Sequence, residues 1–160
     1  MRVDQIAYFA HSEAQATELK KQLGLAHSEW IEDIVEGDVY LPQQGTEGIS
    51  RGHLRFCYDY SIEVEILTYL GGPHWHQGNP DFLRGSPFLS HVGVHCEQGE
   101  APFVMAGNMP LVQQMQTFKH SNPYLIERQR TYNYLIYDTR PLFGHHTKFI
   151  YRKEPGDGQS

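Results

Sequence analysis

Alternating hydrophobic and polar positions at the start of the chain predict a β-strand over residues 2–9. Gln5, Ala7 and Phe9 fall on one face of this strand, because successive side chains of a strand point to opposite sides. We expect this face to line the interior of the fold. The opposite face, which includes Ile6, is then available to pack against a helix.

A helix is predicted directly after this strand. Ser12 is a suitable N-cap, and Gln15 follows it three residues later, which is the spacing of a capping box. Leu19 and Leu23 continue the apolar stripe of the helix, and Gly24 is expected to end it. The chain therefore begins with a strand followed by an amphipathic helix.

The same order of elements recurs after the middle of the chain. Strands are predicted at about 30–41, 52–60 and 62–69 in the first half, and at about 88–96, 111–119, 130–138 and 145–152 in the second half, with a short helical stretch within about 99–108. Two βαβββ modules in tandem indicate an internal duplication and an α+β fold.

The domain organisation follows from this repeat. Module one covers 1–70 and module two covers 88–153, and a linker at 71–87, rich in glycine and proline, joins them. We expect one domain over 1–153, since 160 residues correspond to a single ordinary domain. Residues 154–160 are expected to be a disordered tail.

Matching the two modules pairs two sets of polar residues. Gln5 of the first strand corresponds to His91, and Glu65 of the fourth strand corresponds to Lys148. Gln5, Glu65 and His91 are able to bind a metal ion. The Lys148 ammonium has no lone pair and repels a divalent cation. This mismatch is the main functional question in the sequence.

Charge and composition exclude several classes of protein. The formal net charge of −6 and the lack of a stripe rich in lysine and arginine argue against nucleic-acid binding. No apolar run approaches the roughly 20 residues needed to span a bilayer, and no secretory signal follows Met1. Cys57 and Cys96 are expected to be free thiols in a reducing compartment. We therefore expect a cytoplasmic protein.

Five motifs along the chain carry a resemblance to a known family. They are Asp4-Gln5-Ile6-Ala7, the helix end Gln22-Leu23-Gly24-Leu25, Glu63-Val64-Glu65-Ile66-Leu67, Ser90-His91-Val92-Gly93-Val94, and Asp138-Thr139 before Gly144-His145. In this order they resemble the vicinal oxygen chelate superfamily, which includes glyoxalase I, the bleomycin-resistance proteins, methylmalonyl-CoA epimerase and the extradiol dioxygenases. The resemblance covers the chain up to about Arg152. It implies a half-open eight-stranded barrel, a pocket for a small molecule, and a homodimer.

The resemblance also implies a metal centre, held by side chains from the first and last strand of each module. The matching residues that can act as ligands are Gln5, Glu65 and His91. A carbonyl oxygen, a carboxylate and an imidazole together favour Zn²⁺, Ni²⁺, Mn²⁺ or Fe²⁺. The implied function is a metal-dependent lyase, isomerase or dioxygenase that acts on a small oxygenated molecule. Glu65 would then be both a ligand and the catalytic proton shuttle.

Lys148 departs from the family pattern, which places a glutamate near this position. Three alternatives are open. His146, two residues earlier on the same face, replaces the missing ligand. Alternatively, Lys148 forms an ion pair with Glu65 in place of the metal. Lastly, Lys148 binds an anionic substrate beside a metal that has three ligands.

Further side chains are candidates for substrate binding together with Lys148. Arg55 on the third strand and Arg130 and Tyr132 on the seventh are expected to face the pocket, where a guanidinium would bind a carboxylate or an enediolate. Tyr132 and Tyr134 are also typical of a core or of a dimer interface. The alternative function is a metal-free protein of the bleomycin-resistance kind, which binds an aromatic or cationic small molecule.

Overall fold

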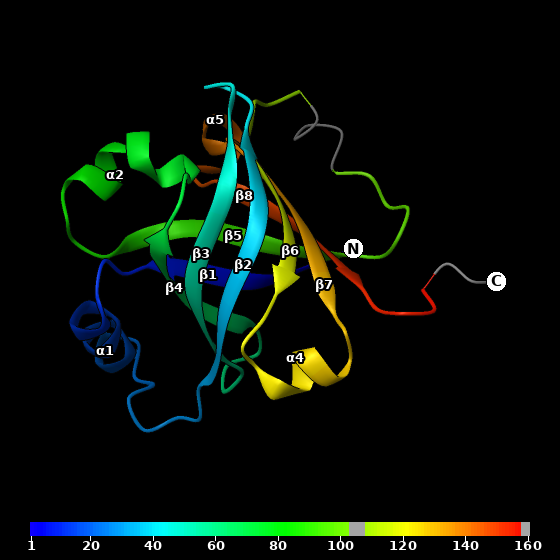
Figure 1. The fold of residues 1–160 in the computed structure, drawn as a ribbon. Coiled ribbons are helices and arrows are strands. Elements are labelled where there is room, and N and C mark those ends of the chain that lie inside the picture. The colour runs from blue at the N-terminus through cyan, green and yellow to red at the C-terminus, as the bar shows by residue number, and fades with distance from the viewer. Residues whose placement is uncertain (103–107, 158–160) are drawn as a thin grey trace.

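A barrel of β-strands with short helices around it is the architecture of the computed structural model, which describes residues 1–102 and 108–157 (Figure 1). The first module contains β1 (Arg2–Phe9), α1 (Glu13–Gln22), β2 (Ile31–Leu41), β3 (Thr46–Cys57) and β4 (Glu63–Gly71). The linker contains the short 3-10 helix η1 (Trp75–Gly78) and α2 (Pro80–Leu83). The second module contains β5 (Phe88–Cys96), β6 (Leu111–Lys119), α4 (Pro123–Glu127), β7 (Thr131–Tyr137), α5 (Arg140–Phe143) and β8 (Thr147–Lys153).

The duplication predicted from the sequence is present in the strand pairing. Module one has the strand order β1-β4-β3-β2, and module two has the equivalent order β5-β8-β7-β6. In each module the first and last strands are parallel. Ala7, two residues after Gln5, pairs with Glu65, and Gly93, two residues after His91, pairs with Lys148. The two modules therefore share one register, and the α+β class with eight strands is confirmed.

The barrel is closed, whereas the resemblance implied a half-open one. The modules meet at two antiparallel seams, β1 with β5 and β2 with β6. The second seam extends from the Glu36–Lys119 pair to the Tyr40–Gln114 pair, so that every strand has two hydrogen-bonded neighbours. Among the strands of residues 1–102 and 108–157, this pairing leaves no free edge, which removes the exposed backbone groups that an open edge presents.

Alternation along the strands separates an inner core from an outer one. The inner cluster contains buried apolar side chains from both modules, among them Phe9, Leu54, Met115 and Ile136. On the outside of module one, α1 packs Ala16 and Leu19 against Ile66 of β4, and Figure 1 shows this helix beside the barrel. Burial of such side chains is the main source of stability for a barrel of this kind.

The first helix is capped as expected. The backbone N–H of Gln15 donates to Ser12 Oγ at 3.2 Å, and the Gln15 side chain accepts from the backbone N–H of His11 at 2.9 Å. Gly24 follows the helix with φ of 73°, a left-handed conformation that glycine adopts without strain. The Ser12 cap is confirmed, while the Gln15 side chain bonds to His11, one residue before the N–H that a capping box uses.

Other element boundaries differ from the predictions. The third strand begins at Thr46 rather than near 52, because the polar residues after the Pro42–Gly45 turn pair with β2 while their side chains face solvent. The short helices α2, α4 and α5 and the 3-10 helix η1 were not predicted. In α2 and α4, an asparagine before a proline caps the first turn, namely Asn79 and Asn122.

Some predictions fall at the margins of the described residues. The helix predicted within 99–108 covers 103–107, which lie outside the described residues, and the remaining residues of that stretch are not helical. In the predicted tail, Glu154 forms an ion pair with Arg130, while 158–160 lie outside the described part. The cysteines Cys57 and Cys96 are free. Among the described helices, none has the length and apolar character needed to cross a membrane.

The seam between β2 and β6 depends on Gly37, and this gives a test of closure. A Cβ at Gly37 would lie 2.7 Å from the backbone oxygen of Gln116 and 2.7 Å from Met115 Cε. Gly37→Ala should therefore lower the free energy of unfolding by about 1–3 kcal/mol, because the backbone must shift. Gly71→Ala is the control, since a Cβ there meets nothing within 4 Å. Urea denaturation of both variants measures the difference; equal losses would contradict the closed seam.

Candidate functional site

A cavity of about 330 Å³ occupies one end of the barrel. Five aromatic side chains contribute to its wall: Phe56, Tyr58, Tyr124, Tyr132 and Tyr134. The exposed fraction falls from 58% at Tyr58 to 7% at Tyr134, so the cavity runs from an open mouth to a buried end. This volume is in the range of pockets that hold small ligands.

An ion pair between the two modules lies at the buried end. Glu65 of β4 is 0% exposed, and its Oε2 lies 3.8 Å from Lys148 Nζ of β8 and 3.8 Å from His91 Nε2. Both Glu65 and Lys148 line the cavity. No described residue hydrogen-bonds to either oxygen of Glu65. The carboxylate therefore depends on the positive charge of Lys148, because an unpaired buried charge is very unfavourable.

Burial controls the protonation of these groups. Desolvation raises the pKa of Glu65 above its ordinary value of 4.5, and the nearby Glu63 raises it further, while Lys148 opposes the rise. The Lys148 Nζ also lies 4.1 Å from the centre of the Tyr134 ring, which is a cation–π contact. Burial lowers the pKa of His91 well below 6.5, so this imidazole is neutral.

Gln5 connects His91 to a second carboxylate in the cavity wall. Its Oε1 lies 3.1 Å from His91 Nε2, and its Nε2 donates to Glu63 Oε2 at 2.9 Å. The hydroxyl of Tyr58 donates to the other oxygen of Glu63 at 2.8 Å. The structure thus brings together Gln5, Glu65, His91 and Lys148, the four positions that the internal repeat singled out.

This set of donors does not fit a divalent metal with four ligands. Gln5, Glu65 and His91 are close enough to surround one ion, but the fourth position is the Lys148 ammonium. An ammonium 3.8 Å from the carboxylate already supplies the positive charge and repels a second cation. Within the described residues, no group of three or more His, Cys, Asp or Glu side chains has the geometry to hold a metal ion.

His146, the alternative fourth ligand, lies away from this centre. Its Nε2 is 3.6 Å from Asp138 Oδ1, and its ring centre is 4.1 Å from that of Trp75. Burial lowers its pKa to about 4. His146 does not line the cavity. It also does not line a smaller adjoining cavity, whose wall includes His76, His91 and Lys148. The geometry therefore does not place it as a fourth ligand beside Glu65 and His91.

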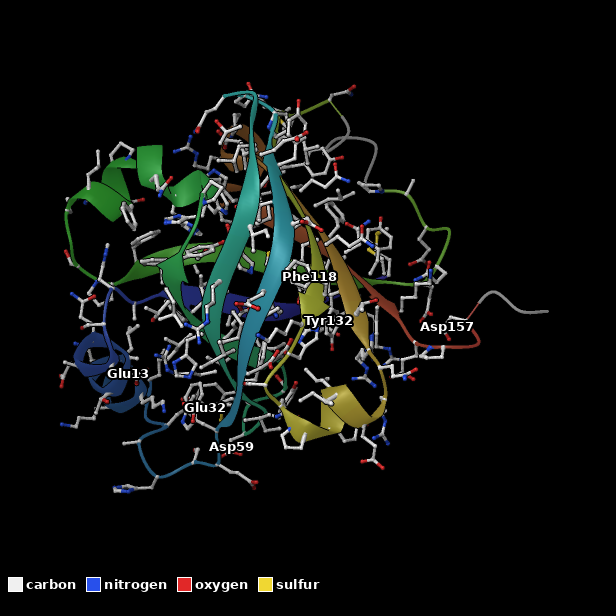
Figure 2. The ribbon with its side chains drawn as sticks, viewed as in Figure 1. Glu13, Glu32, Asp59, Phe118, Tyr132 and Asp157 are labelled. Carbon is white, nitrogen blue, oxygen red and sulfur yellow. The ribbon has the colours of Figure 1, made fainter. Side chains whose placement is uncertain are left out.

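Arg55 was expected to face the pocket, and the structure places it on the outer face of β3. It is completely buried and forms ion pairs with Glu13 of α1 and, at 3.9 Å, with Glu32 of β2, both labelled in Figure 2. Its guanidinium also donates to Thr68 Oγ1 at 3.2 Å. The neighbours Leu54 and Phe56 line the cavity instead, so Arg55 fixes helix α1 to the barrel.

Arg130 and Tyr132 do line the cavity, near its mouth. Arg130 donates to Glu154 Oε1 at 2.6 Å, which leaves its charge partly neutralised. Tyr132 of β7, labelled in Figure 2, is stacked near Tyr134 with ring centres 5.6 Å apart and planes at 13°. Tyr58 is a wall residue that the sequence analysis missed. It continues the face of Leu54 and Phe56, whereas the opposite face, with Arg55, was expected to be the inner one.

Known proteins resemble this chain only weakly. No protein-family model matches the chain, and no curated protein matches its sequence. Among solved structures, it is similar to methylmalonyl-CoA epimerase from Mycobacterium tuberculosis, with 12% identity over 98% of this chain and 91% of that one and a TM-score of 0.48. It is also similar to a hypothetical protein from Bacillus halodurans C-125, with 16% identity over 96% and 95% of the two chains and a TM-score of 0.45.

A third solved structure is a selenomethionine form of methylmalonyl-CoA epimerase, with 13% identity over 93% of each chain and a TM-score of 0.41. Two of these three structures are methylmalonyl-CoA epimerases. The identities and scores are too low to assign a reaction to this chain. The homodimer implied by the resemblance stays a prediction.

The ion pair gives a prediction about stability. Lys148→Met should lower the free energy of unfolding by about 3–5 kcal/mol near neutral pH, because it leaves Glu65 buried without a cation. Adding Glu65→Gln to Lys148→Met should restore most of the loss, since the charge is then gone. Urea denaturation of the two single variants and the double variant measures the coupling. Additive losses would show that the two side chains do not interact.

The cost of Lys148→Met should also depend on pH. The pKa of Glu65 is raised in the folded state, so folding favours the protonated acid, and this contribution is lost as pH rises through the folded pKa. Lys148→Met should therefore destabilise strongly at about pH 8 and much less at about pH 5. Denaturation curves at both values provide the measurement. Glu18→Gln, at an exposed position, is the control and should show little change.

Proposed function

We propose that this protein binds a small, flat, aromatic molecule in the barrel cavity without a metal ion, with the polar end of the ligand at the Glu65–Lys148 pair. The observation that carries this proposal is the Lys148 ammonium 3.8 Å from Glu65, at the fourth position of the repeat. A side chain there supplies the charge that a metal would supply. The cavity above the pair then serves to bind a ligand.

The walls of the cavity support a flat ligand. Tyr132 and Tyr134 present nearly parallel rings, and Phe56, Tyr58 and Tyr124 add further aromatic surface. Aromatic side chains bind planar molecules through offset stacking and burial of apolar area. A cavity of about 330 Å³ limits the ligand to one or two rings.

The buried end defines the polar group of the ligand. Glu65 lacks hydrogen-bond donors to both oxygens among the described residues, and Lys148 carries donors only. A group that donates to Glu65 and accepts from Lys148 satisfies both side chains. Phenols, catechols and carboxamides have this combination, whereas a carboxylate offers no donor and would be repelled by Glu63 and Glu65.

A second candidate function is the metal-dependent lyase, isomerase or dioxygenase that the resemblance implies. It is favoured by the proximity of three metal-capable side chains, Gln5, Glu65 and His91. Glu65 would be its acid–base residue, because its raised pKa brings the carboxyl closer to neutral pH. The two candidates differ in whether the protein takes up a metal, so metal content separates them.

Binding of simple aromatic compounds tests the first candidate. Isothermal titration calorimetry with catechol, phenol, benzoate and toluene should give higher affinities for catechol and phenol. Their hydroxyl groups donate to Glu65 and accept from Lys148, whereas benzoate has no donor and toluene has neither. Tyr132→Leu should weaken catechol binding by about three- to tenfold through loss of stacking. Tyr40→Leu is the matched control, since Tyr40 is 40% exposed and does not line the cavity. Tighter binding of benzoate, or binding of none of the four, would refute the proposal.

Metal uptake tests the two candidates against each other. The wild-type protein, incubated with Zn²⁺, Ni²⁺, Mn²⁺ or Fe²⁺ and desalted, should retain much less than one ion per chain. Lys148→Glu should gain affinity, because it completes a set of four donors. Lys119→Glu, at a lysine whose side chain is 70% exposed, is the control and should gain none. One tightly held ion per wild-type chain would favour the metal-dependent enzyme.

A further inference from the structure

A chain of hydrogen bonds crosses the barrel interior from the linker to the cavity wall. His76 Nε2 of η1 lies 2.7 Å from Ser90 Oγ of β5, and Ser90 Oγ lies 2.9 Å from His91 Nδ1. His91 Nε2 lies 3.1 Å from Gln5 Oε1, and Gln5 Nε2 donates to Glu63 Oε2 at 2.9 Å. The first four of these side chains are at most 3% exposed, so water does not compete for the contacts.

Glu63, the last residue of this series of hydrogen bonds, sets the direction of every bond in it. An ionised carboxylate only accepts, so Glu63 requires the N–H₂ group of Gln5, and the Gln5 oxygen then faces His91. His91 must therefore carry its proton on Nε2, which leaves Nδ1 to accept from the Ser90 hydroxyl. Ser90 Oγ in turn accepts from His76, whose proton is also on Nε2. Every donor points toward Glu63.

We propose that this chain is a relay that holds the cavity wall in one hydrogen-bonding state, with His76 and Ser90 as positioning residues. It deepens the proposed function, because Gln5 and Glu63 belong to the cavity of that function. The fixed Gln5 amide donates to Glu63 and holds this carboxylate in place, so this part of the wall favours ligand groups that donate. His76 and Ser90 do not line the cavity, although His76 lines the smaller adjoining one, and their hydrogen bonds reach the cavity wall through His91 and Gln5.

The backbone is shaped to allow this relay. Along the β1–β5 seam, Ala7 pairs with His91 and Tyr8 pairs with Leu89, so Ser90 is an extra residue in β5. Such a bulge places two successive side chains on the same side of a strand. Ser90 and His91 therefore both face the interior.

Gly93 provides the space for the Gln5 amide. It pairs with Gln5 across the same seam, and a Cβ at Gly93 would overlap the Gln5 side chain. Any larger residue would displace the amide that joins His91 to Glu63. Both the bulge and the glycine thus serve the same chain of hydrogen bonds.

Nitrogen-detected NMR of the histidine side chains tests the relay in ligand-free protein. In the wild type, His76 and His91 should both be neutral with the proton on Nε2. Gln5→Met removes the acceptor for His91, so the bonds should reverse and both histidines should shift toward the Nδ1–H form. The tautomer ratio should change by about tenfold, the effect expected for one hydrogen bond. In this series of hydrogen bonds, His76 is connected to Gln5 only through Ser90 and His91. A change in the His76 tautomer would therefore show that the substitution acts through those two residues.

Further variants separate a relay from a local disturbance. Ser90→Ala should abolish the effect of Gln5→Met on His76, because the link is cut, and Ser90→Thr should retain it, because the hydroxyl remains. Gln116→Met is the control, since it makes the same substitution at an exposed position of β6 that is not part of the relay. It should leave both tautomers unchanged.

Two results would overturn the inference. One is a wild-type spectrum in which His91 is charged or carries its proton on Nδ1. If Gln5→Met does not fold, the wild-type spectrum alone tests the inference. The other is an unchanged His76 tautomer in folded Gln5→Met. Both measurements are made without a ligand, so their failure is distinct from a failure of the aromatic compounds to bind.

Discussion

The buried pair of Glu65 and Lys148 is the interaction on which the rest of the site depends. The Glu65 carboxylate is completely buried and receives no hydrogen bond from a described residue. In such a position a carboxylate needs either a nearby cation or a proton. Lys148 comes from the other module, so the same contact neutralises the charge and joins the two halves of the barrel at their centre.

The duplication explains why these side chains meet. Both modules use the same register between their first and last strands, so positions equivalent in the repeat converge on one point of the interior. Backbone symmetry is kept, while the side chains at the equivalent positions differ in charge. A carboxylate opposite an ammonium gives a charge balance within the protein, whereas two carboxylates would require a bound cation. The function of the cavity therefore depends on side chains at one pair of positions rather than on the fold.

The sequence was sufficient to predict these positions wherever strands alternate regularly. Gln5 was placed on an inward face by period-two alternation, and Glu65 and Lys148 were singled out by their correspondence in the repeat; all three line the cavity. Arg55 is an exception, because it was expected on the inner face of β3 and lies on the outer one. Its strand has polar and apolar residues on both faces, so alternation alone did not identify the inner face. Burial of a guanidinium beneath α1 is made favourable by Glu13, a partner 42 positions away that periodicity cannot indicate.

The hydrogen bonds of the relay could not be predicted from the sequence, for a different physical reason. Alternation places Ser90 on the opposite face from His91, but the bulge in β5 brings both side chains to the interior. A bulge is an irregularity in pairing with a neighbouring strand, so it is invisible in the pattern of a single strand. His76 reaches the relay from the linker, where its burial depends on packing against Phe9 and Trp75. The hydrogen bonds that polarise the cavity wall thus arise from tertiary pairing, and the repeat indicates only two members of the relay, Gln5 and His91.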